Sequence, residues 1–303
     1  LIPVLLKSRL YPLIQKYAGK IMTFKAKLRA ACEKNQTLLC VGLDPDPALM
    51  PVHCIQEFNR AIVDATCDLV CAFKPNLAFY EAAGTTGIDA LADTVSYIHE
   101  MSPGVIVLGD AKRGDIGSTS SHYAKALFKT WNFDAATVNA YAGQDAIQPF
   151  LNYANKGTFI WCRSSNPGAV EFQDLSIISI GDEDQKPRVT LHQQIANRAR
   201  NWDVYGNVGL VVGATYPEEL AAVRAECPDM PILAPAVGAQ SGNLASTVKA
   251  GIDSRGRNLI ISSSRSIIYA SRRKSDYRSA ARMAAENLRN DINQILQENG
   301  TPW

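Results

Sequence analysis

The sequence predicts an α/β fold of the (β/α)8 TIM-barrel class, and three observations support this prediction. Short apolar runs recur eight times along the chain, with stretches of helical spacing between them. The runs are continuously apolar instead of alternating, which is typical of parallel strands that are buried on both faces. The length of 303 residues suits one barrel with additions, since such barrels take ~250 residues. Eight units favour a closed barrel over an open doubly wound sheet.

The eight predicted strands share an apolar composition and a length typical of barrel strands, and they cover residues 38–43, 69–74, 105–110, 135–139, 158–162, 208–212, 232–234 and 259–262. Helical spacing separates them, for example at Phe58, Ile62 and Ala65. Residues 277–296 have the apolar periodicity of a final barrel helix. Residues 164–187 form the least regular region, which predicts a lid or a binding element.

The first residues of the chain differ from the barrel pattern. An apolar start is followed by Lys7, Arg9 and Lys16, and Met22 lies just before the first barrel-like segment. We interpret residues 1–21 as an N-terminal extension or a linker from a larger polypeptide. Residues 22–303 are then expected to form a single (β/α)8 barrel domain.

Composition favours small-molecule chemistry. The formal net charge is +2, and the longest block of like charge is residues 272–274, so we expect neither nucleic acid nor a membrane as a partner. No stretch approaches the ~20 apolar residues of a membrane span. The seven cysteines are an odd number and several lie in apolar runs, so we interpret them as reduced. These features predict a cytoplasmic enzyme.

Polar residues follow almost every predicted strand, on the side where barrel enzymes place their active sites. In chain order these residues are Asp44; Lys74 and Asn76; Asp110, Lys112 and Asp115; Asn139; Ser164, Ser165 and Asn166; Gln240; and Arg265. One polar residue at a strand end would be unremarkable, because every strand leads into a loop. The whole series predicts an active site at the carboxyl ends of the strands.

The end of the third strand carries the densest charge. Asp110 and Lys112 are two residues apart, so on a strand their side chains point to the same face, which we expect to be the barrel interior. Asp115 adds a second carboxylate. An alternating Asp/Lys/Asp set can stay ionised when buried because each charge has an opposite neighbour. The alternative is a surface turn with solvated charges, which the preceding strand disfavours.

The last two strand ends predict a phosphate site, since loops after the seventh and eighth strands often bind phosphate in such barrels. Gly238 and Gly242 allow a close approach of the backbone to an anion. Backbone N–H groups near Ser264 and Arg265 can donate to phosphate oxygens at a helix start, and Arg265 adds a planar, bidentate donor.

These residues together resemble the orotidine 5′-phosphate decarboxylase family, in its second, longer subgroup. The segments that carry the resemblance occur in the family's order, and they are residues 43–45, 73–76, 110–116 with Thr119, 163–167, 235–240 and 263–265. One departure is Ser164, where related sequences often have threonine. It leaves open whether Ser164 or Ser165 contacts the base.

The resemblance implies decarboxylation of orotidine 5′-monophosphate (OMP) to uridine 5′-monophosphate (UMP) in pyrimidine biosynthesis, with no metal and no organic cofactor. It implies a catalytic array of Lys74, Asp110, Lys112 and Asp115. It also implies a homodimer in which Asp115 and Thr119 complete the partner's site. The implied substrate contacts are those to the ribose from Asp44, Lys74 and Asn76, to the base from Ser164 or Ser165, and to the phosphate from Gln240 and Arg265. Asn166, Pro235 and Ser264 are further expected substrate-binding residues.

The chemistry fits these residue types. Loss of CO₂ from C6 of the pyrimidine leaves a carbanion in the ring plane, where the ring cannot delocalise it. Lys112 would stabilise this anion and then protonate C6, while Asp110 would disfavour the substrate carboxylate beside it. One charge contact at ~4 Å and an effective dielectric of ~20 gives about 4 kcal/mol, whereas the largest enzymatic accelerations require ~23 kcal/mol.

Two alternatives remain from the sequence. The first is a Mg²⁺-dependent keto-sugar-phosphate lyase or synthase of the same barrel superfamily, such as hexulose-phosphate synthase. Such enzymes need an additional acidic metal ligand at a neighbouring strand end, where this chain has Lys74. The second is a catalytically silent nucleotide-binding or scaffolding dimer, which the intact set of charged residues disfavours.

Overall fold

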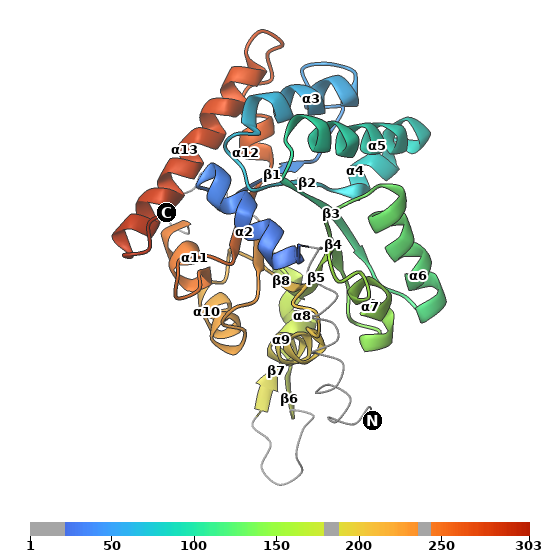
Figure 1. The fold of residues 1–303 in the computed structure, drawn as a ribbon, viewed down its shortest axis with the longest axis vertical. Helices are drawn as coiled ribbons and strands as arrows, with labels where there is room; N and C mark the ends of the chain where they lie inside the picture. Colours follow the sequence, from blue (N-terminus) through green and yellow to red (C-terminus); the bar gives the residue numbers. More distant parts are fainter. Residues whose placement is uncertain (1–21, 179–187, 236–243) are drawn as a thin grey trace.

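Eight parallel strands close into a barrel in the computed structural model, which describes residues 22–178, 188–235 and 244–303 (Figure 1). The order around the barrel is β1-β10-β9-β8-β5-β4-β3-β2, and β1 closes it by pairing with β10 on one side and β2 on the other. The strands are β1 Leu39–Leu43, β2 Ala72–Pro75, β3 Ile106–Arg113, β4 Ala135–Val138, β5 Gly157–Arg163, β8 Val208–Val212, β9 Ile232–Pro235 and β10 Leu259–Ser263. The predicted (β/α)8 fold and all eight predicted strands are confirmed.

Helices surround the barrel, as Figure 1 shows. They are α2 Phe24–Asn35, α3 Ile55–Thr66, α4 Leu77–Ala82, α5 Gly84–Met101, α6 Gly117–Lys125, α7 Gln144–Leu151, α8 Val170–Gln173, α9 Leu191–Trp202, α10 Pro217–Glu226, α11 Leu244–Gly251, α12 Arg265–Ile268 and α13 Tyr277–Glu298. A π-helical turn, Ala126–Thr130, extends α6, and a 3-10 turn, Pro167–Ala169, precedes α8. The predicted final helix is α13.

Helix α2 packs against the amino-terminal end of the barrel. Thr23 begins the helix, because its side chain accepts a hydrogen bond from the backbone N–H of Ala26. Phe24 is fully buried, and its ring meets that of Phe159 edge to face at a centroid distance of 5.8 Å. This contact buries the amino-terminal end of the barrel core, so the opposite end, at the carboxyl ends of the strands, is where a substrate can enter.

Residues 164–178, the described part of the irregular region, are more regular than the sequence predicts. Helix α8 is followed by β6 Ser176–Ile178, which pairs antiparallel with β7 Arg188–Thr190. In Figure 1 these two strands extend away from the barrel as an arm. Thr190 and Gln193 then form a capping box that begins α9. The strands are only three residues long each, which explains why the sequence pattern does not reveal them.

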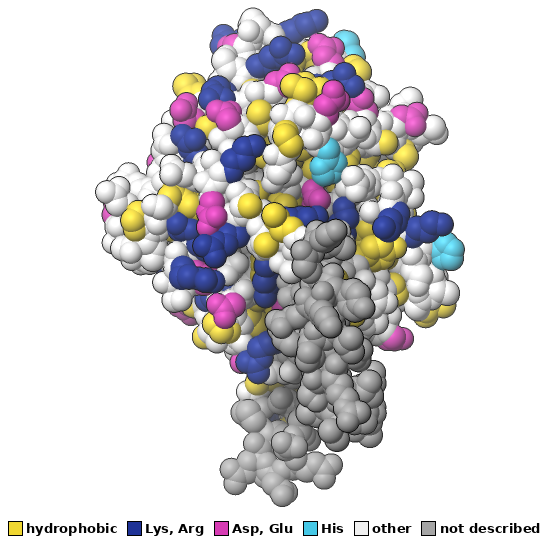
Figure 2. All heavy atoms as spheres, in the orientation of Figure 1, with side chains coloured by type: hydrophobic (Ala, Val, Ile, Leu, Met, Phe, Trp, Pro, Cys, Tyr) yellow, Lys and Arg dark blue, Asp and Glu magenta, His cyan; other side chains and the backbone are white. Residues whose placement is uncertain are grey.

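The surface agrees with the near-neutral composition. On the face shown in Figure 2, Lys and Arg side chains are interspersed with Asp and Glu. None of the helices in the described ranges is both long enough and apolar enough to cross a bilayer.

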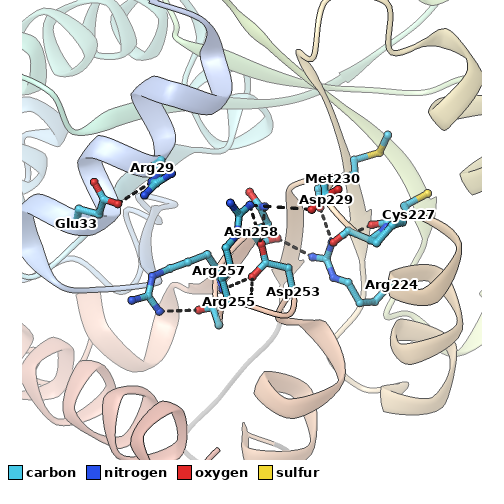
Figure 3. Close-up of polar contacts among 12 residues, drawn as sticks. Arg29, Glu33, Arg224, Cys227, Asp229, Met230, Asp253, Arg255, Arg257 and Asn258 are labelled. Atoms are coloured by element: carbon cyan, nitrogen blue, oxygen red, sulfur yellow. Dashed lines mark hydrogen bonds and ion pairs between the residues drawn. The ribbon is translucent and has the colours of Figure 1, made fainter. Parts of the chain in front are cut away.

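Arg224 ties together two loops at the amino-terminal end of the barrel (Figure 3). The side chain is 8% exposed, and its guanidinium donates to five carbonyl oxygens, those of Gly251, Cys227, Pro228, Met230 and Asn258, at distances of 2.7 to 3.2 Å. These carbonyls belong to the segments that lead into β9 and β10. One buried side chain therefore satisfies the backbone of both segments.

Replacing Arg224 by Met should lower the free energy of unfolding by about 3 kcal/mol, because buried carbonyl groups that lose their donor keep the cost of desolvation. Urea denaturation at pH 7, followed by circular dichroism, measures this change. Arg200 is the matched control, since it also donates to a carbonyl, that of Glu226, but is exposed. Arg200→Met should cost less than about 1 kcal/mol, and equal stability of the two variants would contradict the role of Arg224.

Candidate active site

A chain of three charges lies at the carboxyl ends of β2 and β3. Lys74 Nζ lies 2.9 Å from Asp110 Oδ2, and Lys112 Nζ lies 2.6 Å from Asp110 Oδ1. The carboxylate of Asp110 thus sits between two ammonium groups. The side chains of Lys74 and Asp110 are 6% and 11% exposed, whereas that of Lys112 is 38% exposed. The prediction that Lys74, Asp110 and Lys112 meet at this end of the barrel agrees with this geometry.

The backbone brings Lys112 to Asp110 by a route that strand alternation does not describe. The pairing of β3 with β4 shifts register between Gly109 and Arg113, and Lys112 has a φ of 48°. A non-glycine residue in this left-handed region is uncommon and is held there by its surroundings. We expected strand alternation to aim both side chains into the barrel interior, but alternation does not explain how they meet here. Lys112 lies at the open mouth of the barrel.

Thr137 on β4 holds this unusual turn, and the sequence analysis did not identify it. Its side chain is 1% exposed, and its hydroxyl donates to Asp110 Oδ1 at 2.8 Å. The Thr137 hydroxyl oxygen also accepts hydrogen bonds from the backbone N–H groups of Ala111 and Lys112, each at 3.0 Å. One hydroxyl thus orients the carboxylate and fixes the backbone of the lysine. A polar residue within the apolar run of β4 was the available signal.

The electrostatics keep this array ionised. Burial alone would raise the pKa of Asp110, but the positive charges of Lys74 and Lys112 outweigh it and hold the pKa well below its usual range. Burial alone would lower the pKa of Lys74, but the negative charges of Asp110 and Asp44 raise the pKa above its usual range. A fixed arrangement of this kind can stabilise a new negative charge that forms beside the ammonium of Lys112.

Trp161 on β5 lies beside the same lysine. The Nζ atom of Lys112 is 5.8 Å from the centroid of the Trp161 ring, within reach of a cation–π interaction. The residue also packs against the hydrophobic core. Trp161 therefore packs against the hydrophobic core and also lines one side of the charged site.

Asp44 follows β1 and faces the other end of the array. Its Oδ2 atom accepts a hydrogen bond of 2.7 Å from the hydroxyl of Ser264. Its Oδ1 atom is buried and has no hydrogen-bond partner among the described residues, so it is an acceptor available to a ligand hydroxyl. Gly42 permits this arrangement, since a Cβ atom there would lie 2.7 Å from Ser264 Cβ.

Asn76 follows the end of β2, and Asp115 follows the end of β3. Asn76 forms an isolated β-bridge with Asp110, and its side-chain oxygen caps α4 by accepting from the N–H of Ala78 at 3.3 Å. Asp115 is engaged in its own turn, where its Oδ1 accepts from the N–H of Ile116 at 2.6 Å. Thr119 follows on α6 and is half-buried. The contacts of Asp115 within one chain are thus with its own loop, not with Lys112.

The segment after β5 forms a compact turn. The hydroxyl of Ser164 donates to the side-chain oxygen of Asn166 and also accepts from the N–H of Asn166 at 3.4 Å. Ser164 is 8% exposed, Ser165 is half-buried and Asn166 is exposed. The structure places all three residues at the carboxyl-terminal mouth of the barrel.

The predicted phosphate end is described in part. Pro235 ends β9 and pairs with Ser262 of β10, and Ser264 precedes α12, which begins at the exposed Arg265. Gln240, with Gly238 and Gly242, lies outside the described residues. The strand ends that lead to both predicted turns are therefore adjacent in the barrel.

The side chains of the charged array also decide whether this site offers ligands for a metal ion. Both oxygens of Asp110 already face ammonium groups. In the described ranges, no group of three or more His, Cys, Asp or Glu side chains is arranged to hold a metal ion. The position beside Asp110 on β2, where the Mg²⁺-dependent alternative requires a carboxylate, carries the ammonium of Lys74.

Replacing Asp110 by Asn should change how stability depends on pH. A carboxyl group whose pKa is lowered by folding stabilises the protein above its unfolded pKa of about 3.9, and this contribution is lost as pH falls toward the folded-state pKa. The wild-type protein should therefore lose more unfolding free energy between about pH 5 and pH 3 than Asp110→Asn. Urea denaturation at the two pH values measures both losses.

Asp89 provides the control, since it is exposed on α5. Asp89→Asn should retain the wild-type dependence on pH. An Asp110→Asn variant with the same acid loss as the wild type would contradict the lowered pKa.

Comparisons with known proteins agree with this geometry. Residues 37–280 match the model of the family described as Orotidine 5′-phosphate decarboxylase / HUMPS family. The chain is 49% identical over 281 residues to the orotidine 5′-phosphate decarboxylase of Ralstonia pickettii, covering 90% of this chain and 99% of that protein. It is 47% identical over 284 residues to the protein of the same name from Thermomicrobium roseum, covering 91% and 97%.

Solved structures show the same fold. The OMP decarboxylase of Leishmania donovani matches with a TM-score of 0.75 and 36% identity, covering 90% of this chain and 98% of that chain. The UMP synthase of the same organism matches with a TM-score of 0.78 and 37% identity, covering 90% of this chain and 56% of that longer chain. The closed barrel, the charges at its mouth and these similarities lead to one conclusion: the chain belongs to the orotidine 5′-phosphate decarboxylase / HUMPS family.

Proposed function

We propose that this protein catalyses the decarboxylation of OMP to UMP, a carboxy-lyase reaction of pyrimidine biosynthesis. The observation that carries the proposal is the Lys74–Asp110–Lys112 array, in which one buried carboxylate lies between two ammonium groups. The relatives at 47–49% identity that bear this activity in their names cover about nine tenths of the chain, which supports the same reaction. The Mg²⁺-dependent alternative lacks a carboxylate at the position of Lys74.

In this proposal Lys112 is the acid. Loss of CO₂ leaves an electron pair on C6 in the plane of the ring, and the ammonium of Lys112 stabilises that pair before donating a proton to it. Asp110 keeps Lys112 oriented and lies near the departing carboxylate, which it disfavours by charge repulsion. Lys112 is the most exposed of the three residues, so its ammonium is the more accessible of the two to the reacting part of a ligand.

The remaining predicted contacts divide among the parts of the substrate. We assign the ribose hydroxyls to Asp44, with its free buried oxygen, and to Lys74 and Asn76 beside it. We assign the phosphate to Arg265 and Gln240. Pro235 and Ser264 would line that end of the site. The nucleotide would then span the barrel mouth from the end of β5, on the side of the base, to the ends of β9 and β10, on the side of the phosphate.

Ser165 is the better candidate for the base contact. The hydroxyl of Ser164 already donates to Asn166 and is nearly buried, whereas Ser165 is half-buried at the mouth. The side chain of Asn166 then serves to hold Ser164. This assignment addresses the choice that the sequence leaves open.

We also propose a homodimer in which Asp115 and Thr119 reach the partner's site. The Asp115 carboxylate accepts a hydrogen bond within its own loop, from the N–H of Ile116, and we assign its catalytic contact to the partner subunit. Ile116 beside it is 67% exposed and Tyr141 is 89% exposed, and their loops adjoin through the bond from Asn139 N to Arg113 O. Large exposed apolar side chains of this kind are typical of subunit contacts.

The extent and location of the protein complete the proposal. Residues 22–303 constitute one decarboxylase domain, and residues 1–21 are an extension or linker. The seven cysteines are free thiols, and burial raises the pKa of Cys40 to about 12 and of Cys227 to about 11, which suits inert thiols in the cytoplasm.

Replacing Lys112 by Ala should reduce turnover of OMP by at least about 10³-fold, since one charge contact of about 4 kcal/mol is lost together with the proton donor. The fall in absorbance of OMP measures the rate, and circular dichroism checks that the variant is folded. A near-normal rate would rule out Lys112 as the acid.

The wild-type assay is repeated with EDTA as its control. We expect full activity, because the proposed mechanism uses no metal. Loss of OMP decarboxylation with EDTA and its recovery with Mg²⁺ would contradict the metal-free mechanism. Absence of any turnover of OMP by the wild type would refute the proposal, and Mg²⁺-dependent turnover of a keto-sugar phosphate would then favour the keto-sugar-phosphate alternative over the catalytically silent dimer.

Mixing Lys112→Ala subunits with Asp115→Ala subunits should restore activity if Asp115 acts on the partner. Each hybrid dimer then has one site with both residues intact, and half of randomly mixed dimers are hybrids, so about a quarter of wild-type activity is expected. The assay is run after co-refolding, with differently tagged subunits to demonstrate hybrids. Hybrids without activity would place Asp115 in its own subunit's site.

A further inference from the structure

A fully buried arginine stands at the end of β5, immediately before the segment assigned to the base. Arg163 is 0% exposed. Its Nη2 atom lies 3.0 Å from Asp174 Oδ2, and its Nη1 atom donates to Gln173 Oε1 at 3.4 Å. The guanidinium also lies 4.2 Å from the centroid of the Tyr216 ring, which comes from the loop after β8. Arg163 thus joins β5 to α8 and to the neighbouring loop.

Gln173 connects this cluster directly to the base segment. Its Oε1 atom accepts a hydrogen bond of 2.8 Å from the backbone N–H of Ser164. Its own backbone carbonyl is held by His192 Nδ1 at 2.9 Å, and the same nitrogen lies 3.4 Å from Asp174 Oδ1. His192 on α9 therefore fixes the end of α8, and Gln173 at that end in turn fixes the backbone of Ser164.

The other side of the segment packs against the loop after β8. The N–H of Gly213 donates to the carbonyl of Arg163 at 2.9 Å. A Cβ atom at residue 213 would lie 2.8 Å from Ser165 Cα, so the two backbones are in direct contact. The segment 164–166 is thus held on one side by Gln173 and on the other by Gly213.

We propose that Gln173 and Asp174 are positioning residues for recognition of the pyrimidine base. This inference rests on the proposed function, in which the base meets Ser164 or Ser165. Gln173 acts through the N–H of Ser164, and Asp174 acts by neutralising Arg163, because a buried guanidinium without a counter-charge would distort the strand end that carries the segment. A misplacement of about 1 Å in such a segment is enough to weaken binding and catalysis.

The experiment compares two ligands that differ only in the base. Dissociation constants for UMP and for ribose 5-phosphate are measured by calorimetry for the wild type, Gln173→Ala and Asp174→Asn. We expect both variants to bind UMP about 10-fold more weakly, which corresponds to one hydrogen bond of about 1.4 kcal/mol. Binding of ribose 5-phosphate should stay within about twofold of the wild type, because its contacts lie on other strand ends.

Two further variants sharpen the comparison. Glu171→Gln removes an exposed charge from the same helix, α8, and should bind both ligands like the wild type. Gln173→Glu keeps an oxygen acceptor for Ser164 N–H and adds a charge that Arg163 can pair with, so it should restore UMP binding to within about threefold. If Asp174→Asn does not fold, the Gln173 variants decide the outcome, since Gln173 is neutral and half-buried.

The inference is overturned if Gln173→Ala binds UMP like the wild type. It is also overturned if both ligands weaken equally, because that result shows general loosening of the barrel mouth. The wild-type measurements distinguish failure of this inference from failure of the proposed decarboxylase function. A wild type that neither decarboxylates OMP nor binds UMP refutes both, whereas an active wild type with unchanged variants refutes only the positioning role.

Discussion

The active site depends on one constraint, which is that the carboxylate of Asp110 must stay between the ammonium groups of Lys74 and Lys112. An isolated charge at this depth would neutralise itself by a shift of its pKa. Three alternating charges instead hold one another ionised, which is why the pKa of Asp110 falls and that of Lys74 rises. The barrel makes this possible because β2 and β3 are neighbours, and their carboxyl ends bring residues 36 positions apart to within 2.9 Å.

The backbone around Lys112 serves the same constraint. A lysine with a φ of 48° is not a conformation that the residue prefers. Thr137 offsets this cost by accepting hydrogen bonds from two consecutive N–H groups while it donates to Asp110. The hydroxyl is buried and belongs to a strand whose register is fixed by its neighbours on both sides. A strained turn is therefore supported by a rigid element, as expected where a reacting group must be held in place.

Sequence reasoning was successful where a pattern repeats and limited where contacts are long-range. Eight continuous apolar runs predict the closed barrel, and the polar residue after each run predicts that Asp44, Lys74 and Asp110 converge, because parallel strands end at one edge. The sequence does not reveal the left-handed turn at Lys112. A regular strand would also place Asp110 and Lys112 on the same face, so their spacing does not distinguish the two backbones. Thr137 is hidden inside an apolar strand. The partnership of Arg163 with Asp174 depends on helix α8, whose C-cap is Asp174 and which at four residues is too short to show any periodicity.

The energetics explain why so many strand ends take part. One ammonium contact gives about 4 kcal/mol, but the largest accelerations require ~23 kcal/mol, so Lys112 alone leaves most of the barrier in place. The remainder has to come from groups that bind the unreacting parts of the nucleotide and hold C6 against the lysine. Residues such as Asp44, with one buried oxygen free for a ligand, suit that purpose. The charged array itself sits at strand ends whose register the barrel fixes, whereas the proposed base and phosphate contacts belong to the segments that follow the strands. In this proposal the reacting groups are held by strands and the nucleotide is bound by the adjoining loops, so side chains that fix those loops contribute to how the nucleotide is placed against the lysine.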